Sequence, residues 1–154
     1  MDWQLEIVMA GQAILATGLG GFIGWEREKH GCEAGIRTYG AVALGACVFA
    51  LISMHVPDRT NPHVIAAGVV TGIGFLGAGV IVQNKGNIVG LTTAATLWST
   101  GAVGLAVGYR MFVLSGLSAV IVFSLLAAHH LPFWSRLKQV GEGDSDEHGP
   151  RRRS

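Results

Sequence analysis

This chain contains a long interval without acidic residues, which limits the folds open to it. Between Asp58 and Glu142 there is no aspartate or glutamate, and over most of that interval the only basic residues are Lys85 and Arg110. Charged residues make up 14% of the sequence, whereas an average soluble protein has about 25%. The chain therefore lacks the charge needed to cover a water-facing surface, and its apolar runs are of the kind that a lipid bilayer requires.

Five mostly apolar stretches are long enough to cross a bilayer, which takes about 20 residues of helix. Polar or turn-forming residues separate them, and Pro57 and Pro62 make the second gap a loop. We therefore expect an all-α integral membrane protein, a bundle of about five transmembrane helices. The predicted membrane domain covers residues 1–140, with spans at about 5–25, 39–56, 64–83, 91–108 and 111–131.

The orientation follows from basic residues near the span ends, because cytoplasmic loops are enriched in Lys and Arg. One side of the predicted bundle carries only Arg59 and Arg110. The N-terminus is therefore expected outside and the C-terminus in the cytoplasm, where the polar segment 141–154 forms a disordered tail. Leaving out the distant Arg151, Arg152 and Arg153, the basic residues on the cytoplasmic side are Arg27, Lys29, Arg37, Lys85, Arg136 and Lys138.

Glycines in the third span have the G-x-G-x-x-G spacing of a dinucleotide-binding turn, at Gly72, Gly74 and Gly77. Such a turn needs an acid about 20 residues later to bind the ribose, and the next acid is Glu142. Small residues four positions apart instead allow close packing of helices in lipid. The same faces are also compatible with a narrow pore, or with a dimer. The glycines predicted to pack helices are Gly20, Gly24, Gly68, Gly72, Gly79, Gly104 and Gly108.

Polar groups inside the spans are few, and they concentrate in the fourth span. Thr92, Thr96 and Ser99 are four and three residues apart and share one helix face. Their hydroxyls either bond to carbonyls and neighbouring helices or line a hydrated pathway.

No metal site is predicted, because no recognisable ligand spacing is present. His55, Asp58 and His63 share the predicted outer loop, and whether they bind a cation is left open.

Three sequence blocks resemble the N-terminal membrane domain of the MgtC/SapB family. They are "GGFIGWERE" followed by "AGIRT", then "GIGFLGAGVI", then "GLTTAATLW", and together they cover about residues 20–108. The resemblance implies a protein of the bacterial cytoplasmic (inner) membrane. Family members are associated with growth in low magnesium, with survival of pathogens in host cells (virulence) and with restraint of the F-type ATP synthase.

The sequence departs from the family in two ways. Many members carry a soluble C-terminal domain, which we expect this chain to lack. Some members have Asn and Cys where this chain has Thr92 and Ser99, so functions tied to those side chains do not carry over.

The charged residues of the first family block suggest a lock between two helix ends. Glu26 and Arg27 directly follow the first predicted span, while Arg37 and Thr38 precede the second. We expect a carboxylate–guanidinium pair to join these ends and to present a cytoplasmic surface. A solvated, weakly interacting loop is the alternative.

Two functions follow. The first is a regulatory membrane protein that acts through a membrane partner such as the F-type ATP synthase, and homo-oligomers are possible. The second is a cation channel or transporter, with magnesium as the obvious ion. No nucleophile–base pair, phosphate loop or basic stripe is present, so we expect neither an enzyme nor a cofactor nor nucleic-acid binding.

Overall fold

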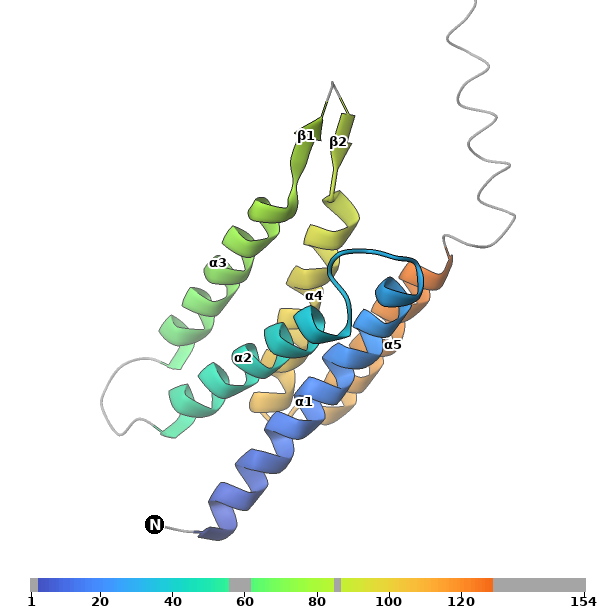
Figure 1. Cartoon of the computed structure of the whole chain (residues 1–154). Helices are drawn as coiled ribbons and strands as arrows, with labels where there is room; N and C mark the ends of the chain where they lie inside the picture. Colours follow the sequence, from blue (N-terminus) through green and yellow to red (C-terminus); the bar gives the residue numbers. More distant parts are fainter. Residues whose placement is uncertain (1–2, 56–61, 85–86, 129–154) are drawn as a thin grey trace, which may run out of the picture.

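The computed structural model describes residues 3–55, 62–84 and 87–128, and this part of the chain holds five helices and one short hairpin (Figure 1). The predicted tail and the end of the fifth predicted span lie outside it. The five helices coincide with the five predicted spans to within a few residues. They are α1 (Trp3–Lys29), α2 (Ile36–His55), α3 (Pro62–Val80), α4 (Leu91–Gly108) and α5 (Phe112–Ala128).

The hairpin was not predicted, since its residues were assigned to the end of the third span and to a loop. Strands β1 (Val82–Asn84) and β2 (Asn87–Val89) pair antiparallel, with Val82 opposite Val89. The fold is therefore an α-helical bundle with one small β-ribbon between α3 and α4.

Backbone hydrogen bonds typical of helix C-termini end α1 and α4. Gly31 adopts φ 68°, and the amide of Cys32 donates to the carbonyl of Arg27 at 3.1 Å. At the end of α4, Arg110 takes the same role with φ 62°. Glycine favours this left-handed conformation and a larger residue is strained in it, so the turn after α4 stores strain that the turn after α1 does not.

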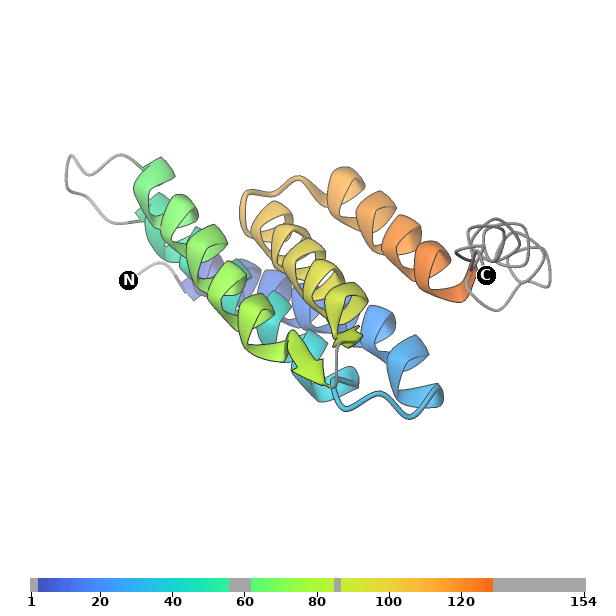
Figure 2. The same cartoon turned by 90° about the horizontal axis from the view of Figure 1, so that it is seen from above.

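Three helices form the centre of the bundle and two flank it (Figures 1 and 2). Helices α1, α2 and α4 all pack on one another, α3 lies against α2 and α4, and α5 lies against α1 and α4. The last turn of α1, the start of α2, the hairpin, the start of α4 and the end of α5 gather at one end of the bundle, called here the hairpin end (Figure 1).

Glycines of α1 and α4 allow these helices to approach α2 closely. A Cβ on Gly20 would lie 2.5 Å from the carbonyl oxygen of Tyr39, and one on Gly24 would lie 2.8 Å from that of Gly35. On the other side of α2, a Cβ on Gly104 would collide with the carbonyl of Ala43, and one on Gly108 would lie 2.9 Å from the carbonyl oxygen of Cys47. The centre of the bundle therefore depends on contacts between backbones.

The predicted packing glycines of α3 lie differently. A Cβ on Gly68, Gly72 or Gly79 would meet no heavy atom within 4 Å. Gly68 and Gly72 instead line an open apolar groove of about 730 Å³ between α2 and α3. Within the described residues, Gly68, Gly72 and Gly79 do not make the close helix contacts expected of them. Helix α3 packs mainly against α4.

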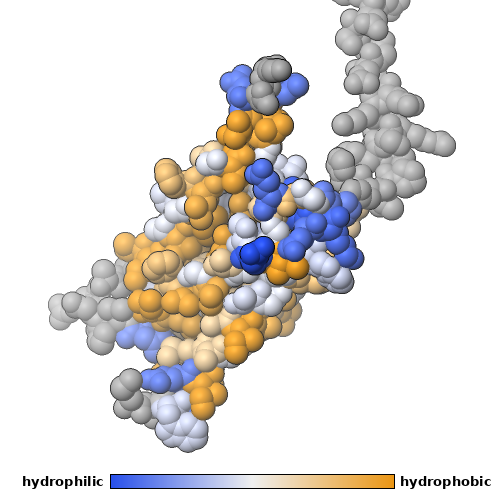
Figure 3. All heavy atoms as spheres, in the orientation of Figure 1, coloured by the Kyte–Doolittle hydropathy of each residue, from blue (hydrophilic) through white to orange (hydrophobic). Residues whose placement is uncertain are grey.

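The flanks of the bundle are apolar. Large side chains point outward on several helices, and Phe75 is 81%, Val113 86% and Leu125 69% exposed. On the face shown in Figure 3, hydrophobic residues cover most of the helical surface and hydrophilic residues gather near its ends. Among the described helices, α1 and α2 are long and apolar enough to cross a membrane, while residues 64–80 and 112–128 form shorter apolar helices.

Candidate functional site

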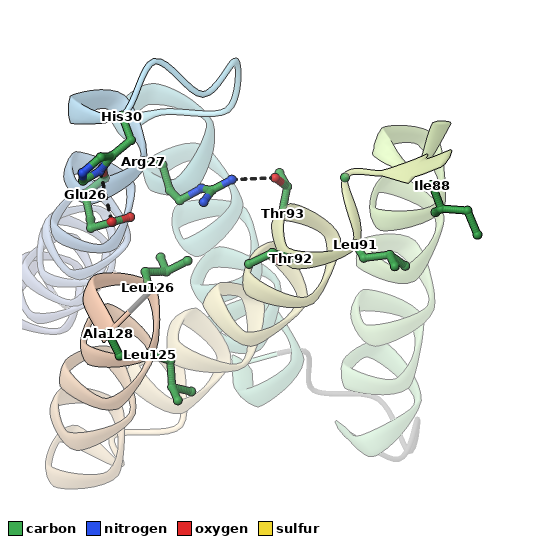
Figure 4. Close-up of a pocket in the computed structure, with 11 residues that line it drawn as sticks. Glu26, Arg27, His30, Ile88, Leu91, Thr92, Thr93, Leu125, Leu126 and Ala128 are labelled. Carbon is green, nitrogen blue, oxygen red and sulfur yellow. Dashed lines mark hydrogen bonds and ion pairs between the residues drawn. The ribbon is translucent and has the colours of Figure 1, made fainter. Parts of the chain in front are cut away.

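A cavity of about 800 Å³ opens at the hairpin end, between α1, α4 and α5 (Figure 4). It brings together the last charged turn of α1 and the first turn of α4, which are more than 60 positions apart in sequence. Its walls combine ionisable, hydroxyl and apolar side chains, and this mixture makes it the candidate site. The lining residues are Glu26, Arg27, His30, Ile88, Gly90, Leu91, Thr92, Thr93, Leu125, Leu126 and Ala128.

Glu26 is the buried acid of this cavity, with only 5% of its surface exposed. Its Oε1 lies 3.1 Å from Nδ1 of His30, one helical turn further along α1. The same Nδ1 lies 2.7 Å from the backbone carbonyl oxygen of Glu26. A buried carboxylate is costly without partners, and His30 supplies one from the same helix.

Arg27 connects α1 to α4. Its Nη2 donates to Oγ1 of Thr93 at 2.9 Å, as drawn in Figure 4, whereas its Nε is buried with no acceptor among the described residues. One turn deeper, the hydroxyls of Tyr39 and Thr96 lie 2.6 Å apart and link α2 to α4. A short series of polar contacts thus joins the three central helices at the hairpin end.

We expected an ion pair between Glu26 and an arginine to join the ends of α1 and α2, but other residues make this connection. Among the described residues Arg37 forms no ion pair within 4.0 Å; it is exposed at the start of α2, as is Thr38. The end of α1 and the start of α2 are joined instead by Glu28, whose Oε2 accepts a hydrogen bond from the amide of Ile36 at 2.9 Å. An acid is well suited to the start of a helix, where amides lack intrahelical partners.

The three hydroxyl residues predicted to share a face lie in three different surroundings. Thr92 lines the cavity, Thr96 is buried and Ser99 is half-buried. The hydroxyls of Thr96 and Ser99 donate to the carbonyls of Thr92 and Ala95 at 2.9 Å each. These bonds correspond to the simpler of the two interpretations, in which such hydroxyls bond to their own helix.

Sequence reasoning missed Gln12, a buried residue of α1 far from the cavity. Its Nε2 donates to the carbonyl of Val107 at 2.7 Å and lies 3.3 Å from that of Gly108. It thereby adds a side-chain donor to the carbonyls at the end of α4, where that of Val107 also accepts from the amide of Arg110 at 2.9 Å. The sequence signal was a side-chain amide within an apolar run. A search restricted to ionisable residues does not find it.

The residues considered for a cation are only partly described. Nδ1 of His55 lies 2.8 Å from the carbonyl oxygen of Leu51, while Asp58 and the side chain of His63 lie outside the described residues. Within the described ranges, no group of three His, Cys, Asp or Glu residues is placed to hold a metal.

Comparison with known proteins identifies the family. The family model of the MgtC family matches residues 14–131, which include all of the sequence blocks quoted above and all of the residues that line the cavity. The chain belongs to the MgtC family. This confirms the resemblance inferred from the three sequence blocks, and together with the apolar flanks it makes the chain a helical membrane protein.

Several MgtC-family relatives are similar over most of this chain. It is 40% identical over 127 residues to a protein of Escherichia coli K12 named "Putative magnesium transporter YhiD", covering 76% of this chain and 58% of the relative. It is 42% identical over 109 residues to Protein MgtC of Brucella abortus, covering 71% and 46%. It is 49% identical over 105 residues to Protein MgtC of Salmonella typhimurium LT2, covering 68% and 44%.

The chain thus spans about half the length of the curated relatives that it matches. No solved structure matches it significantly.

Proposed function

We propose that this MgtC-family chain is a multi-pass protein of the bacterial inner membrane that regulates adaptation to low magnesium or host-cell stress. In this proposal all five helices span the membrane and the hairpin end faces the cytoplasm. The distribution of basic residues supports this orientation, because Arg27, Lys29 and Arg37 lie at that end. The name of one relative, "Putative magnesium transporter YhiD", supports the link to magnesium.

The main support for the regulatory role is that the centre of the bundle is closely packed. The backbone contacts of Gly20 and Gly104 with α2 leave α1, α2 and α4 in direct contact. Helices α3, α4 and α5 contain no Asp, Glu, Lys or Arg. Moving a divalent ion through such a centre is unfavourable, because charge in the membrane interior needs polar partners. A non-enzymatic protein that binds a membrane partner, such as the F-type ATP synthase, needs no such path.

Magnesium transport is the second candidate. The relative named as a putative magnesium transporter favours it, and so does the buried carboxylate of Glu26 in a cavity at one membrane face. Magnesium is usually bound by one or two carboxylates and retains several waters. In this proposal Glu26 would receive the ion, and the glycine contacts would have to separate for its passage.

The two candidates are separated by measuring magnesium flux into proteoliposomes with a trapped indicator. Glu26→Gln tests the cavity, and Glu33→Gln, in an exposed position outside it, is the matched control. The regulatory proposal predicts no flux above that of empty vesicles from protein shown to be folded. Flux that falls only in Glu26→Gln would replace it with transport.

The partner is tested separately, by affinity capture from membranes of cells grown in low magnesium. An unrelated tagged five-helix protein controls for non-specific capture. Specific recovery of ATP synthase subunits supports the partner proposal, and their equal recovery with the control refutes it.

A further inference from the structure

We propose that the hairpin-end cavity binds the zwitterionic, phosphate-bearing headgroup of a membrane phospholipid. This inference rests on the membrane placement given above, but it does not depend on whether the protein regulates or transports. Its basis is that two sources of positive potential and one carboxylate line a single cavity, whose other walls combine polar and apolar side chains.

The first source of positive potential is Arg27. One of its nitrogens is held by Thr93, which fixes the guanidinium on the cavity wall (Figure 4). A guanidinium has five N–H donors in a rigid fork that suits phosphate oxygens, and Arg27 lines the cavity. The guanidinium of Arg27 therefore places a positive charge and hydrogen-bond donors at the cavity.

The second source is the start of α4, an 18-residue helix. Its N-cap is Gly90, which has no side chain to accept hydrogen bonds from the first amides. These amides lack intrahelical partners, and they carry the positive end of the helix dipole. Gly90, Leu91 and Thr92 line the same cavity as Arg27, so both sources act on one volume.

The negative charge of Glu26 favours a zwitterionic ligand over a simple anion. Its buried carboxylate lies beside His30 in the same wall, and its negative charge would repel a bare anion held by Arg27. A headgroup that carries an ammonium group beside its phosphate places the positive charge near Glu26 and the negative charge near Arg27. The charge pattern of the cavity thus matches phosphatidylethanolamine better than an acidic lipid.

The apolar wall distinguishes a lipid from a soluble phosphate ester. Ile88, Leu91 and Leu125 border the cavity and are 58%, 57% and 69% exposed. About 20 residues of α1 suffice to cross the hydrocarbon core, so the last turn of this 27-residue helix reaches the headgroup layer. Acyl chains attached to a bound headgroup would cover the exposed side chains, which a water-soluble phosphate leaves uncovered.

The test measures phospholipid retained by the purified full chain. The protein is delipidated in detergent and titrated with phosphatidylethanolamine, phosphatidylglycerol or inorganic phosphate, and binding is read by native mass spectrometry. Arg27→Gln removes the proposed phosphate ligand, and Arg27→Lys keeps its charge without the fork. Lys29→Gln is the matched control, because it removes the same charge two residues away, outside the cavity.

We expect one tightly held phosphatidylethanolamine per chain. Arg27→Gln should weaken binding by about tenfold or more, the loss expected for a hydrogen bond to a charged group. Arg27→Lys should be intermediate and Lys29→Gln unchanged, all at unaltered helical circular dichroism.

Equal binding by Arg27→Gln and Lys29→Gln refutes the proposal. So does Arg27-dependent binding of inorganic phosphate without retained lipid, which would assign the cavity to a soluble phosphate. A preference for phosphatidylglycerol refutes the zwitterionic assignment. The lipid-binding assay measures neither growth nor magnesium flux, so a negative result does not affect the proposed function. In the same way, the absence of a magnesium-dependent phenotype does not affect the proposed lipid site.

Discussion

Replacing Gly104 by alanine tests the closest contact in the bundle. The added methyl group would collide with the carbonyl oxygen of Ala43 and lie 2.9 Å from its Cα, whereas ordinary contacts of a Cβ begin at 3.4 Å. The obstacle is backbone in the middle of a helix, so no side chain can rotate away. Helices α2 and α4 must therefore move apart, and the other contacts between them loosen with them.

Two opposing effects set the magnitude. Overpacking of this kind costs about 1–3 kcal/mol, while alanine in place of glycine favours a helix by up to about 1 kcal/mol. We therefore expect a net loss of about 1–2 kcal/mol for Gly104→Ala. Gly104→Val, which adds two more methyl groups at the same contact, should lose more.

Gly74→Ala is the matched control, because a Cβ at Gly74 on α3 would meet nothing within 4 Å. Stability is measured by titrating dodecylmaltoside micelles with SDS and following helical circular dichroism. The control should unfold at an equal or higher SDS fraction than the unchanged chain, and Gly104→Ala at a lower one. If both variants unfolded at the same SDS fraction, the close approach of α2 and α4 would be incorrect.

Three further substitutions and one labelling experiment have defined outcomes. Tyr39→Phe removes a buried hydroxyl contact of 2.6 Å and should lower the free energy of unfolding by about 1 kcal/mol in the same titration; an unchanged midpoint contradicts the contact. Gln12→Leu removes the side-chain donor to the carbonyl of Val107, which keeps the amide of Arg110, and should cost about 1 kcal/mol; a stabilised variant would count against that role. Arg110→Gly relieves a left-handed residue with φ 62° and should stabilise the chain by up to about 1 kcal/mol in thermal unfolding, whereas a loss of stability would show that the arginine side chain matters more than its backbone. A membrane-impermeant maleimide should label half-buried Cys32 in inside-out vesicles but not in spheroplasts, and buried Cys47 only after unfolding; labelling of Cys32 in spheroplasts would reverse the proposed orientation.

The helices were predictable from sequence because the membrane constraint is strong and local. A run of apolar residues that lacks acids has few options in lipid other than a helix, and the fourth predicted span has the bounds of α4. The hairpin had a weaker signal. The residues "NKGN", with two positions between β1 and β2 and a glycine among them, are typical of a tight turn, but the flanking strands are only three residues long.

The site was predictable in its location but not in its contacts. Glu26 and Arg27 were singled out from their place at the end of a span, and both line the cavity. Their partners, His30 and Thr93, depend on how α1 rotates about its axis and on which helix faces it. Neither is fixed by hydrophobic periodicity when a helix is apolar on nearly all sides, and for the same reason the glycines of α3 could not be distinguished from those of α4.

The order of the helices along the chain bears on how the protein is assembled in the membrane. Domains and their parts emerge from the ribosome N-terminus first, so α1 and α2 meet before α4 exists. Helix α3 is made next, yet its main neighbour is α4, which is made only after it. Until then, the surface of α2 around Ala43 has no glycine face against it on the α4 side. A chain stalled after α3 would therefore expose that surface to lipid and to quality-control proteases, and its lifetime should depend on how quickly the fourth helix follows.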